Sequence, residues 1–276
     1  MNKKAALLTC FNRKEKTFNC LNSLFNILQD VDIYLVDDGS SDGTSKMVKE
    51  HFPQVNLIFG SGNLFWNRGM HLAWQYAAPK NYDFYLWIND DIVLYNNALD
   101  ELMACSLICN HQGIISGVVE DESKMNVLYC GTDQKKQLVK PSGTMLPLYH
   151  MNGNLVLIPK YVYQKLGNLD PFFHHDLGDV DYGLRAIKIN IPILSTRLAV
   201  ASGTHNSISR LRLNNSNIFG RFVNLYSPLG NPPLINFYFR KKHYGLFNAV
   251  FYWFFLHFIN IVPDKVNKFL FKNKYS

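Results

Sequence analysis

Short apolar runs alternate with segments of helical periodicity along the first third of the chain. Four runs have the length and composition of buried strands, and they span residues 5–9, 33–36, 55–59 and 84–88. Between them lie three segments with helically spaced apolar residues, at 14–28, 45–51 and 67–77. Strands that alternate with helices over short loops favour a mostly parallel sheet covered by helices on both faces. The pattern therefore predicts an α/β fold.

The second half of the chain has a less regular pattern. Residues 113–119 and 154–158 predict further strands, and residues 198–201 are strand-like. Residues 161–166 predict a short helix, and helical spacing returns after Gly178. We therefore expect the sheet to continue beyond the first four strands.

Polar residues follow each of the first four predicted strands. These polar segments are residues 9–13, 37–38, 63–68 and 89–91. In parallel sheets of this kind, ligands bind beyond the carboxyl ends of the strands. The four segments are therefore expected to share one edge of the sheet and to form a binding site there.

Asp90 and Asp91 end the apolar run at 84–88. Adjacent carboxylates repel each other, so such a pair is costly at a strand end unless a cation lies there. Divalent metals bind through one or two carboxylates together with substrate phosphates. The chain has no GxxxxGK[ST] loop to hold phosphates, which favours a metal–diphosphate site at this pair. The alternative is a solvated Asp-Asp turn.

Three further polar segments each allow a functional and a structural interpretation. Asp38, in the segment VDDGSSDGT (36–44), could accept hydrogen bonds from a nucleobase or ribose, or the segment could serve to cap a helix. Asp179 and Asp181 begin a helix, where a carboxylate either stabilises the helix dipole or acts as a general base. His205 follows the strand-like run at 198–201 and is either structural or a metal ligand.

The composition narrows the class of partner. The 276 residues carry 28 Lys+Arg against 21 Asp+Glu, a formal charge of +7 that favours anionic partners such as nucleotides or a membrane surface. Nucleic acid is disfavoured because the predicted binding edge is acidic. The five cysteines include no CxxC pair, which argues against a disulfide framework or a zinc site and fits a reducing compartment.

The C-terminal segment combines aromatic and basic residues. Residues 247–258 interleave aromatics, and Lys265, Lys268, Lys272 and Lys274 follow. The apolar stretch at 247–262 is shorter than the roughly 20 residues that a spanning helix needs. Three interpretations stay open for 247–274: an interfacial helix on an anionic membrane, a buried helical subdomain, or a homodimer contact.

Five motifs occur together in a fixed order. They are TCFNR at 9–13, VDDGSSDGT at 36–44, NLFWNRG at 63–69, NDD at 89–91 and GDVDYGLRA at 178–186. By these motifs the chain resembles the inverting GT-A glycosyltransferases of family 2, near the bacterial rhamnosyltransferase-like and galactofuranosyltransferase-like members. The resemblance covers about residues 4–210.

The chain departs from the family's motifs at several positions. The family usually has Asn-x-Gly-x-Ala-Gly-Gly where this chain has Phe65, Trp66 and Arg68 within residues 63–69. Asn89 replaces the first acid of the DxD-type motif, and Gly178 replaces the first acid of the Glu-Asp-x-Asp motif. Of these departures, Asn89 is the one that concerns the DxD geometry.

The resemblance implies a domain plan. A Rossmann-like, mostly parallel GT-A sheet with flanking helices would occupy residues 1–210, with a nucleotide-binding half at 1–110 and an acceptor half at 111–210. Residues 211–276 would form a helical extension. The implied location is the cytoplasm, with peripheral attachment to the inner face of the cell membrane.

The resemblance also implies a reaction. A sugar would pass, with inversion, from a UDP- or dTDP-linked donor to a hydroxyl of a glycan or lipid-linked acceptor in bacterial surface polysaccharide synthesis. Mn²⁺ or Mg²⁺ would be held by Asp91 and His205. Asp179 would be the general base, with Asp181 in reserve. The residues expected to bind the nucleotide sugar are Thr9, Asn12, Arg13, Asp38, Asn63, Arg68, Asp90 and Asn154.

Two other functions are compatible with parts of this pattern. A sugar-phosphate nucleotidyltransferase would share a Rossmann-like sheet and acidic metal ligands, but its loop after the first strand would normally be rich in glycine and basic residues. The second alternative is a non-catalytic glycan- or membrane-binding relative, which the losses of acid at Asn89 and Gly178 keep open.

Overall fold

The computed structural model describes residues 2–27, 30–204, 213 and 216–271. The chain divides into two compact units, one made of Met1–His174 with Gly178–His205 and the other of His175–Leu177 with Asn206–Ser276. The predicted halves at 1–110 and 111–210 and the boundary at 210 stay predictions.

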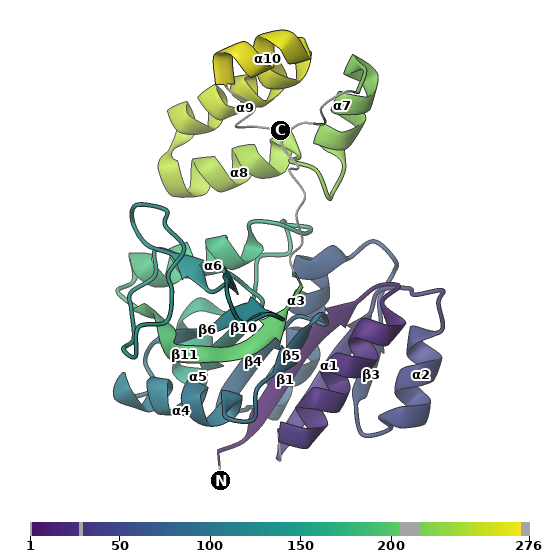
Figure 1. The fold of residues 1–276 in the computed structure, drawn as a ribbon, viewed down its shortest axis with the longest axis vertical. Helices are drawn as coiled ribbons and strands as arrows, with labels where there is room; N and C mark the ends of the chain where they lie inside the picture. The colour runs from purple at the N-terminus through teal and green to yellow at the C-terminus, as the bar shows by residue number, and fades with distance from the viewer. Residues whose placement is uncertain (1, 28–29, 205–212, 214–215, 272–276) are drawn as a thin grey trace. The chain divides into compact units, whose positions relative to one another are not determined.

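A nine-stranded sheet is the centre of the first unit (Figure 1). Its strands run in the order β3-β2-β1-β4-β10-β6-β11-β5, with β7 paired to β6. Their bounds are β1 Lys4–Cys10, β2 Val31–Asp37, β3 Asn56–Phe59, β4 Phe84–Ile88, β5 Ile92–Leu94, β6 Ile114–Asp121, β7 Val127–Tyr129, β10 Leu155–Pro159 and β11 Ile193–Gly203. A separate two-stranded sheet pairs β8 (Gly131–Thr132) with β9 (His150–Met151).

Strands β3, β2, β1 and β4 are parallel to one another, as the alternation predicts. Their carboxyl ends therefore share one edge of the sheet. Strand β10 is antiparallel to both β4 and β6, so the regular pattern ends there. The predicted α/β class with flanking helices and C-terminal helices is confirmed.

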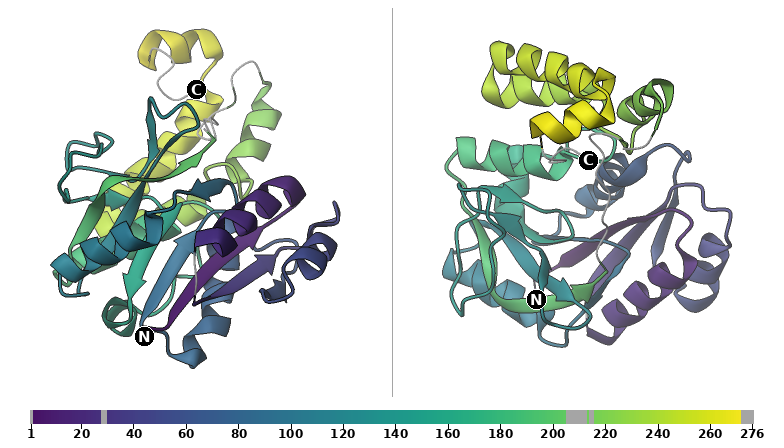
Figure 2. Two further views of the ribbon diagram at one scale, coloured as in Figure 1. Left: turned by 60° about the horizontal axis from the view of Figure 1, so that its bottom comes forward. Right: turned by 45° about the horizontal axis from the view of Figure 1, so that its top comes forward.

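Helices cover both faces of the sheet (Figure 2). The bounds of these helices are α1 Lys14–Ile27, α2 Thr44–His51, α3 Phe65–Ala77, α4 Ala98–Ile108, α5 Lys160–Leu166 and α6 Gly178–Lys188, and a 3-10 turn, η1, spans Ala78–Lys80. Alternate β1 residues point to opposite faces, as in any strand. Ala6 and Leu8 pack in the cluster with α1, α2 and α4, whereas Ala5 and Leu7 pack with α3, α5 and α6. Successive residues of β1 thus pack alternately into the two cores, one on each face of the sheet.

The second unit is helical. Its helices are α7 Ile218–Tyr226, α8 Pro233–Tyr244, α9 Leu246–Ile261 and α10 Asp264–Phe271. The buried Arg221 of α7 donates to the carbonyl of Val262 (3.1 Å) and pairs with Asp264 at 2.7 Å, which ties α7 to the start of α10. None of the helices in the described part of the chain has the length and hydrophobicity that a bilayer span requires.

Candidate active site

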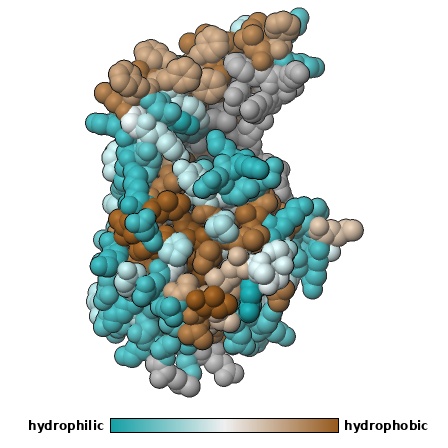
Figure 3. Space-filling view, turned by 90° about the vertical axis from the view of Figure 1, so that its left-hand side faces the viewer, coloured by the Kyte–Doolittle hydropathy of each residue, from teal (hydrophilic) through white to brown (hydrophobic). Residues whose placement is uncertain are grey.

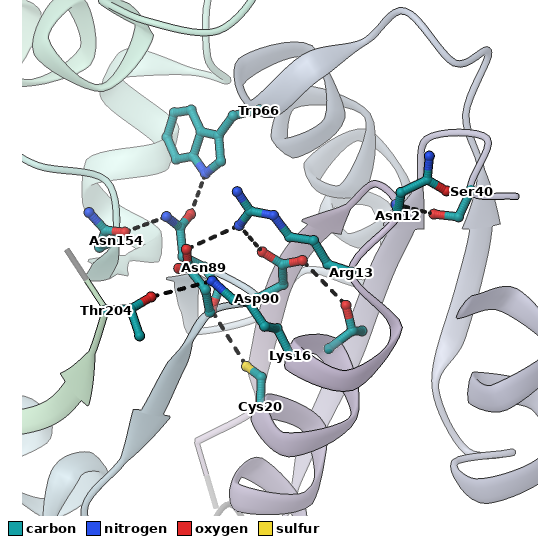
Figure 4. Close-up of polar contacts among 12 residues, drawn as sticks. Asn12, Arg13, Lys16, Cys20, Ser40, Trp66, Asn89, Asp90, Asn154 and Thr204 are labelled. Atoms are coloured by element: carbon teal, nitrogen blue, oxygen red, sulfur yellow. Dashed lines mark hydrogen bonds and ion pairs between the residues drawn. The ribbon is translucent and has the colours of Figure 1, made fainter. Parts of the chain in front are cut away.

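The acidic pair predicted from the sequence lies at the carboxyl end of β4. The side chains of Asp90 and Asp91 are almost fully buried. Arg13, in the loop after β1, places Nη1 3.0 Å from an oxygen of each carboxylate (Figure 4). Thr17 of α1 donates to the other oxygen of Asp90 at 3.3 Å. One positive group thus lies where oxygens of both acids converge.

Burial sets the electrostatics of this pair. The pKa of Asp90 is raised to about 6, chiefly by burial; the Arg13 guanidinium lowers it in part, and the adjacent Asp91 raises it. The Arg13 side chain is 40% exposed, so it can reach solvent from the pair.

The donor set of this pair fits a hard divalent cation, because two carboxylate oxygens already converge on one positive centre. The described residues contain no cluster of three or more acidic, His or Cys ligands. The predicted ligand His205 lies outside the described residues. The part of the site that can be seen therefore offers two carboxylates.

Asn89 connects the acidic pair to the neighbouring strand. Its side-chain oxygen accepts the indole N–H of Trp66 at 2.6 Å, and its amide nitrogen donates to Asn154 Oδ1 (Figure 4). Asn154 in turn donates to Asn152. The departure from the DxD-type motif thus has a local reason, since an aspartate at 89 could accept from Trp66 but could not donate to Asn154.

The start of α6 faces the same segment. Gly153 donates its backbone N–H to Asp179 Oδ2 at 2.8 Å. A side chain at Gly153 would collide with the Trp66 indole and come within 3.2 Å of Asp179 Cβ. Gly153 therefore allows Trp66, Asp179 and the 152–154 turn to pack together.

The two candidate bases have different surroundings. Asp179 is half-buried, and its other oxygen accepts the N–H of Val180 at 2.8 Å. Asp181 is fully buried and forms an ion pair with Arg185 at 2.9 Å, one helical turn further on. An acceptor hydroxyl could therefore reach Asp179 more readily than Asp181.

Gly178 faces the buried side chain of Asn67. A Cβ at 178 would collide with the Asn67 amide, whose Oδ1 has no hydrogen-bond partner among the described residues. The Asn67 amide nitrogen donates to the carbonyls of Asp170 (2.9 Å) and Phe173 (2.8 Å). Asn67 stands where the family motif has alanine, so its larger side chain takes the space that an acid at 178 would need.

Asp38 holds the loop that leads into α3. Its Oδ1 accepts the N–H of Gly62 at 2.8 Å, and its Oδ2 accepts those of Leu64 (2.7 Å) and Phe65 (3.0 Å). Phe65 has a φ of +57°, a conformation that favours the glycine of the family motif. The three hydrogen bonds help to hold that conformation. The Asp38 side chain that accepts them is buried.

The other residues predicted to bind nucleotide lie around this loop. Thr9 packs against Gly69 of α3, where any Cβ would collide with its side chain. Asn12 accepts the N–H of Ser41 at 2.7 Å and so joins the loops after β1 and β2. Asn63 is exposed, and Arg68 donates to the carbonyl of Pro171 at 2.9 Å.

The structure thus brings together Arg13, Asp90 and Asp91, and it joins Asn154 to them through Asn89. Trp66 and Asn67 are the site residues that the sequence reasoning left without a role. The signal for both was their position in a segment where the family motif has small residues.

Comparisons with known proteins agree with this geometry. Residues 6–128 match the family described as glycosyl transferase family 2. No curated protein matches the chain.

Solved structures match over nearly the whole chain. The crystal structure of Staphylococcus aureus TarS residues 1–349 is 14% identical with a TM-score of 0.56, over 99% of this chain and 75% of that one. A second TarS structure is 13% identical with a TM-score of 0.59, over 98% of this chain and 45% of that one. The chain thus spans under half of the second TarS chain, and at these identities the likeness concerns the fold.

The family match covers the loop with Arg13, the segment with Asp38 and the acidic pair. It does not support the nucleotidyltransferase or the non-catalytic alternative. The segment at 6–128 is thus similar to glycosyl transferase family 2, and the chain has a GT-A fold.

Proposed function

We propose that the chain transfers a sugar from a nucleoside-diphosphate sugar to a hydroxyl group, with inversion at the anomeric carbon. One observation carries the proposal: Asp179 binds the 152–154 turn, and the same turn binds Asn89 beside the acidic pair. A base and a cation-binding pair therefore lie on either side of one short segment. Inverting transfer needs that arrangement, because the base and the leaving diphosphate act on the same sugar.

Asp179 acts as the general base. It takes the proton from the acceptor hydroxyl while the oxygen attacks the anomeric carbon and the bond to the diphosphate breaks. The hydrogen bonds that it accepts from Gly153 and Val180 fix the position of the carboxylate. Asp181 supports the helix start through Arg185 instead.

Asp90 and Asp91 would hold Mn²⁺ or Mg²⁺, with His205 as a third ligand. Such a cation supplies charge that stabilises the leaving diphosphate. Arg13 occupies the space between the two carboxylates and is half exposed. Arg13 neutralises the acids in this structure, and its exposed guanidinium would be available to the donor phosphates in a complex.

The loops after β1 and β2 would hold the nucleotide, UDP or dTDP. Thr9, Asn12, Asp38, Asn63, Arg68 and Asn154 are assigned to the donor. Asp38 would act largely through the loop at 62–65, because its oxygens accept three backbone N–H groups.

The proposed acceptor is a glycan, free or lipid-linked, in the synthesis of a bacterial surface polysaccharide. A lipid-linked acceptor would place the reaction at the cytoplasmic face of the cell membrane. The positive charge of the last 71 residues supports that setting.

A donor screen tests the proposal. The purified chain is incubated with UDP- and dTDP-linked sugars, with Mn²⁺, Mg²⁺ or EDTA, and release of nucleoside diphosphate is measured. We expect release from one donor class that depends on the cation. Absence of release from every sugar nucleotide would contradict the proposal, and equal release in EDTA would contradict the role of the metal.

A further inference from the structure

Helix α9 exposes a continuous apolar stripe. The docking face, as we name it, consists of Phe247, Val250, Phe251, Phe254, Phe258 and Ile261. At about 100° per residue these positions fall within an arc of roughly 100° on one side of the helix. Phe247 is 94% exposed, Phe251 73% and Phe254 63%. No polar residue interrupts the stripe.

The opposite side of α9 already forms the core of the helical unit. Ala249, Leu256 and Ile259 are buried there, and α8 packs against α9. A helix at the surface of a soluble domain normally carries polar residues on its outer side. In α9 both sides are apolar, so packing within the unit does not account for the docking face. In Figure 3 apolar side chains gather over these helices at the top of the view.

The adjoining helix has the same character. Val266, Phe269 and Leu270 of α10 are exposed, and Phe269 is 84% exposed. Lys265 and Lys268 are exposed beside them. Helix α10 thus presents apolar side chains with lysines at their edge.

The charged residues of the C-terminal segment, 206–276, are almost all basic. Residues 206–276 contain ten of the 28 Lys+Arg of the chain but only one of the 21 Asp+Glu. That single acid, Asp264, is in an ion pair with the buried Arg221. Residues 1–205, by contrast, carry 18 basic and 20 acidic groups, so the positive charge of the chain comes from the C-terminal unit.

We propose that the docking face of α9 inserts into the interface of an anionic lipid bilayer, with the lysines of α10 and the basic end of α8 at the headgroups. Aromatic side chains partition to the acyl boundary, and basic residues are attracted by anionic headgroups. An apolar stripe flanked by lysines matches an acyl boundary that lies beside anionic headgroups. The proposal deepens the membrane setting proposed above and does not depend on the transfer reaction.

Vesicle flotation with the full chain tests the proposal. The vesicles contain either phosphatidylcholine alone or phosphatidylcholine with about a third phosphatidylglycerol, and no donor is present. We expect binding to the anionic vesicles that weakens with added salt. The double variant Phe251→Glu, Phe254→Glu should bind at least about 100-fold more weakly, since each phenylalanine contributes about tenfold or more. Lys265→Ser with Lys268→Ser should lose about 30-fold.

A matched control is Leu107→Glu, which changes an exposed apolar residue in the first unit and should leave vesicle binding unchanged. Thermal unfolding of each variant verifies that the fold is retained. Equal binding to neutral and anionic vesicles would overturn the role of the lysines. If the wild-type chain stays off the vesicles and forms a dimer that the α9 variant loses, the face is a homodimer contact and the proposal is wrong. Nucleoside diphosphate release is measured separately, so neither result affects the test of transfer.

Discussion

The two units of the chain differ in where their polar and apolar side chains lie. In the first unit the buried acids of the site have specific partners: Arg13 for Asp90 at the sheet edge, and Arg185 for Asp181 in α6. Its large apolar residues form two cores, one on each side of the sheet. In the second unit α9 leaves a whole row of phenylalanines outside. The first arrangement suits chemistry on a bound molecule, and the second suits attachment to a surface.

The difference teaches how function divides along the chain. A reaction site needs a few groups held in fixed positions, so polar networks and close packing dominate it. Attachment to a bilayer needs area and charge, and no single residue is decisive. Single substitutions in the first unit should therefore have large effects on turnover or stability. In the second unit each substitution should weaken membrane binding by a smaller amount, and the effects should be additive.

The largest single effect is expected for Asp179→Asn. The amide cannot take the acceptor proton, so turnover should fall about 1000-fold. Affinity for the donor should be unchanged, because the substitution leaves the nucleotide loops intact. Steady-state release of nucleoside diphosphate and calorimetric donor binding measure the two quantities.

Asp181→Asn is the control for that comparison. It removes the buried partner of Arg185 and should lower the unfolding temperature. The assignments would be reversed by two results together. Asp181→Asn would lose turnover at a normal unfolding temperature, and Asp179→Asn would stay nearly active.

The next effect concerns Arg13→Ala. Two buried carboxylates would lose their shared positive partner, so the free energy of unfolding should fall by about 2 kcal/mol. Because a divalent cation can take the vacated place, Mn²⁺ should restore stability in this variant more than it stabilises the wild type. Urea unfolding with and without Mn²⁺ measures both.

Arg13→Lys provides the matched variant, since it keeps one positive charge near the pair. It should lose less stability than Arg13→Ala and respond less to Mn²⁺. An Arg13→Ala variant that is indifferent to the cation would show that the acids are not a cation site.

The smallest effect tests the contact between α3 and the start of α6. Gly178→Ala should cost about 1 to 2 kcal/mol of unfolding free energy, because the new methyl group meets the Asn67 amide. In Asn67→Ala the space is open, so the same change at 178 should cost much less. If Gly178→Ala lowers the free energy of unfolding equally in the wild type and in Asn67→Ala, Asn67 is not the reason for glycine at 178.

The sequence alone predicts the first four strands and the edge of the sheet where the acids lie. Local signals suffice there, because each strand is a compact apolar run followed by polar residues. The helix at Ala98–Ile108 was not predicted, since its apolar residues are spread around the helix and give little periodicity. The full length of β11 was also missed, and only its part at 198–201 was strand-like in sequence.

Pairings between distant residues could not be read from the sequence. Asn67 and Gly178 are far apart in the chain, and only the fold reveals that one fills the space of the other. The same holds for Asn89. In the sequence it stands in place of an acid, whereas in the structure its side chain joins Trp66 to Asn154. Motif comparison marked these positions as unusual, whereas their physical reason required the three-dimensional contacts.

The most direct test of the account is the anomeric configuration of the first product. Proton NMR of the reaction with the accepted donor compares the anomeric coupling of the transferred sugar with that of the donor. A single displacement with Asp179 as base predicts the opposite configuration in product and donor. Retention of the donor configuration would contradict it.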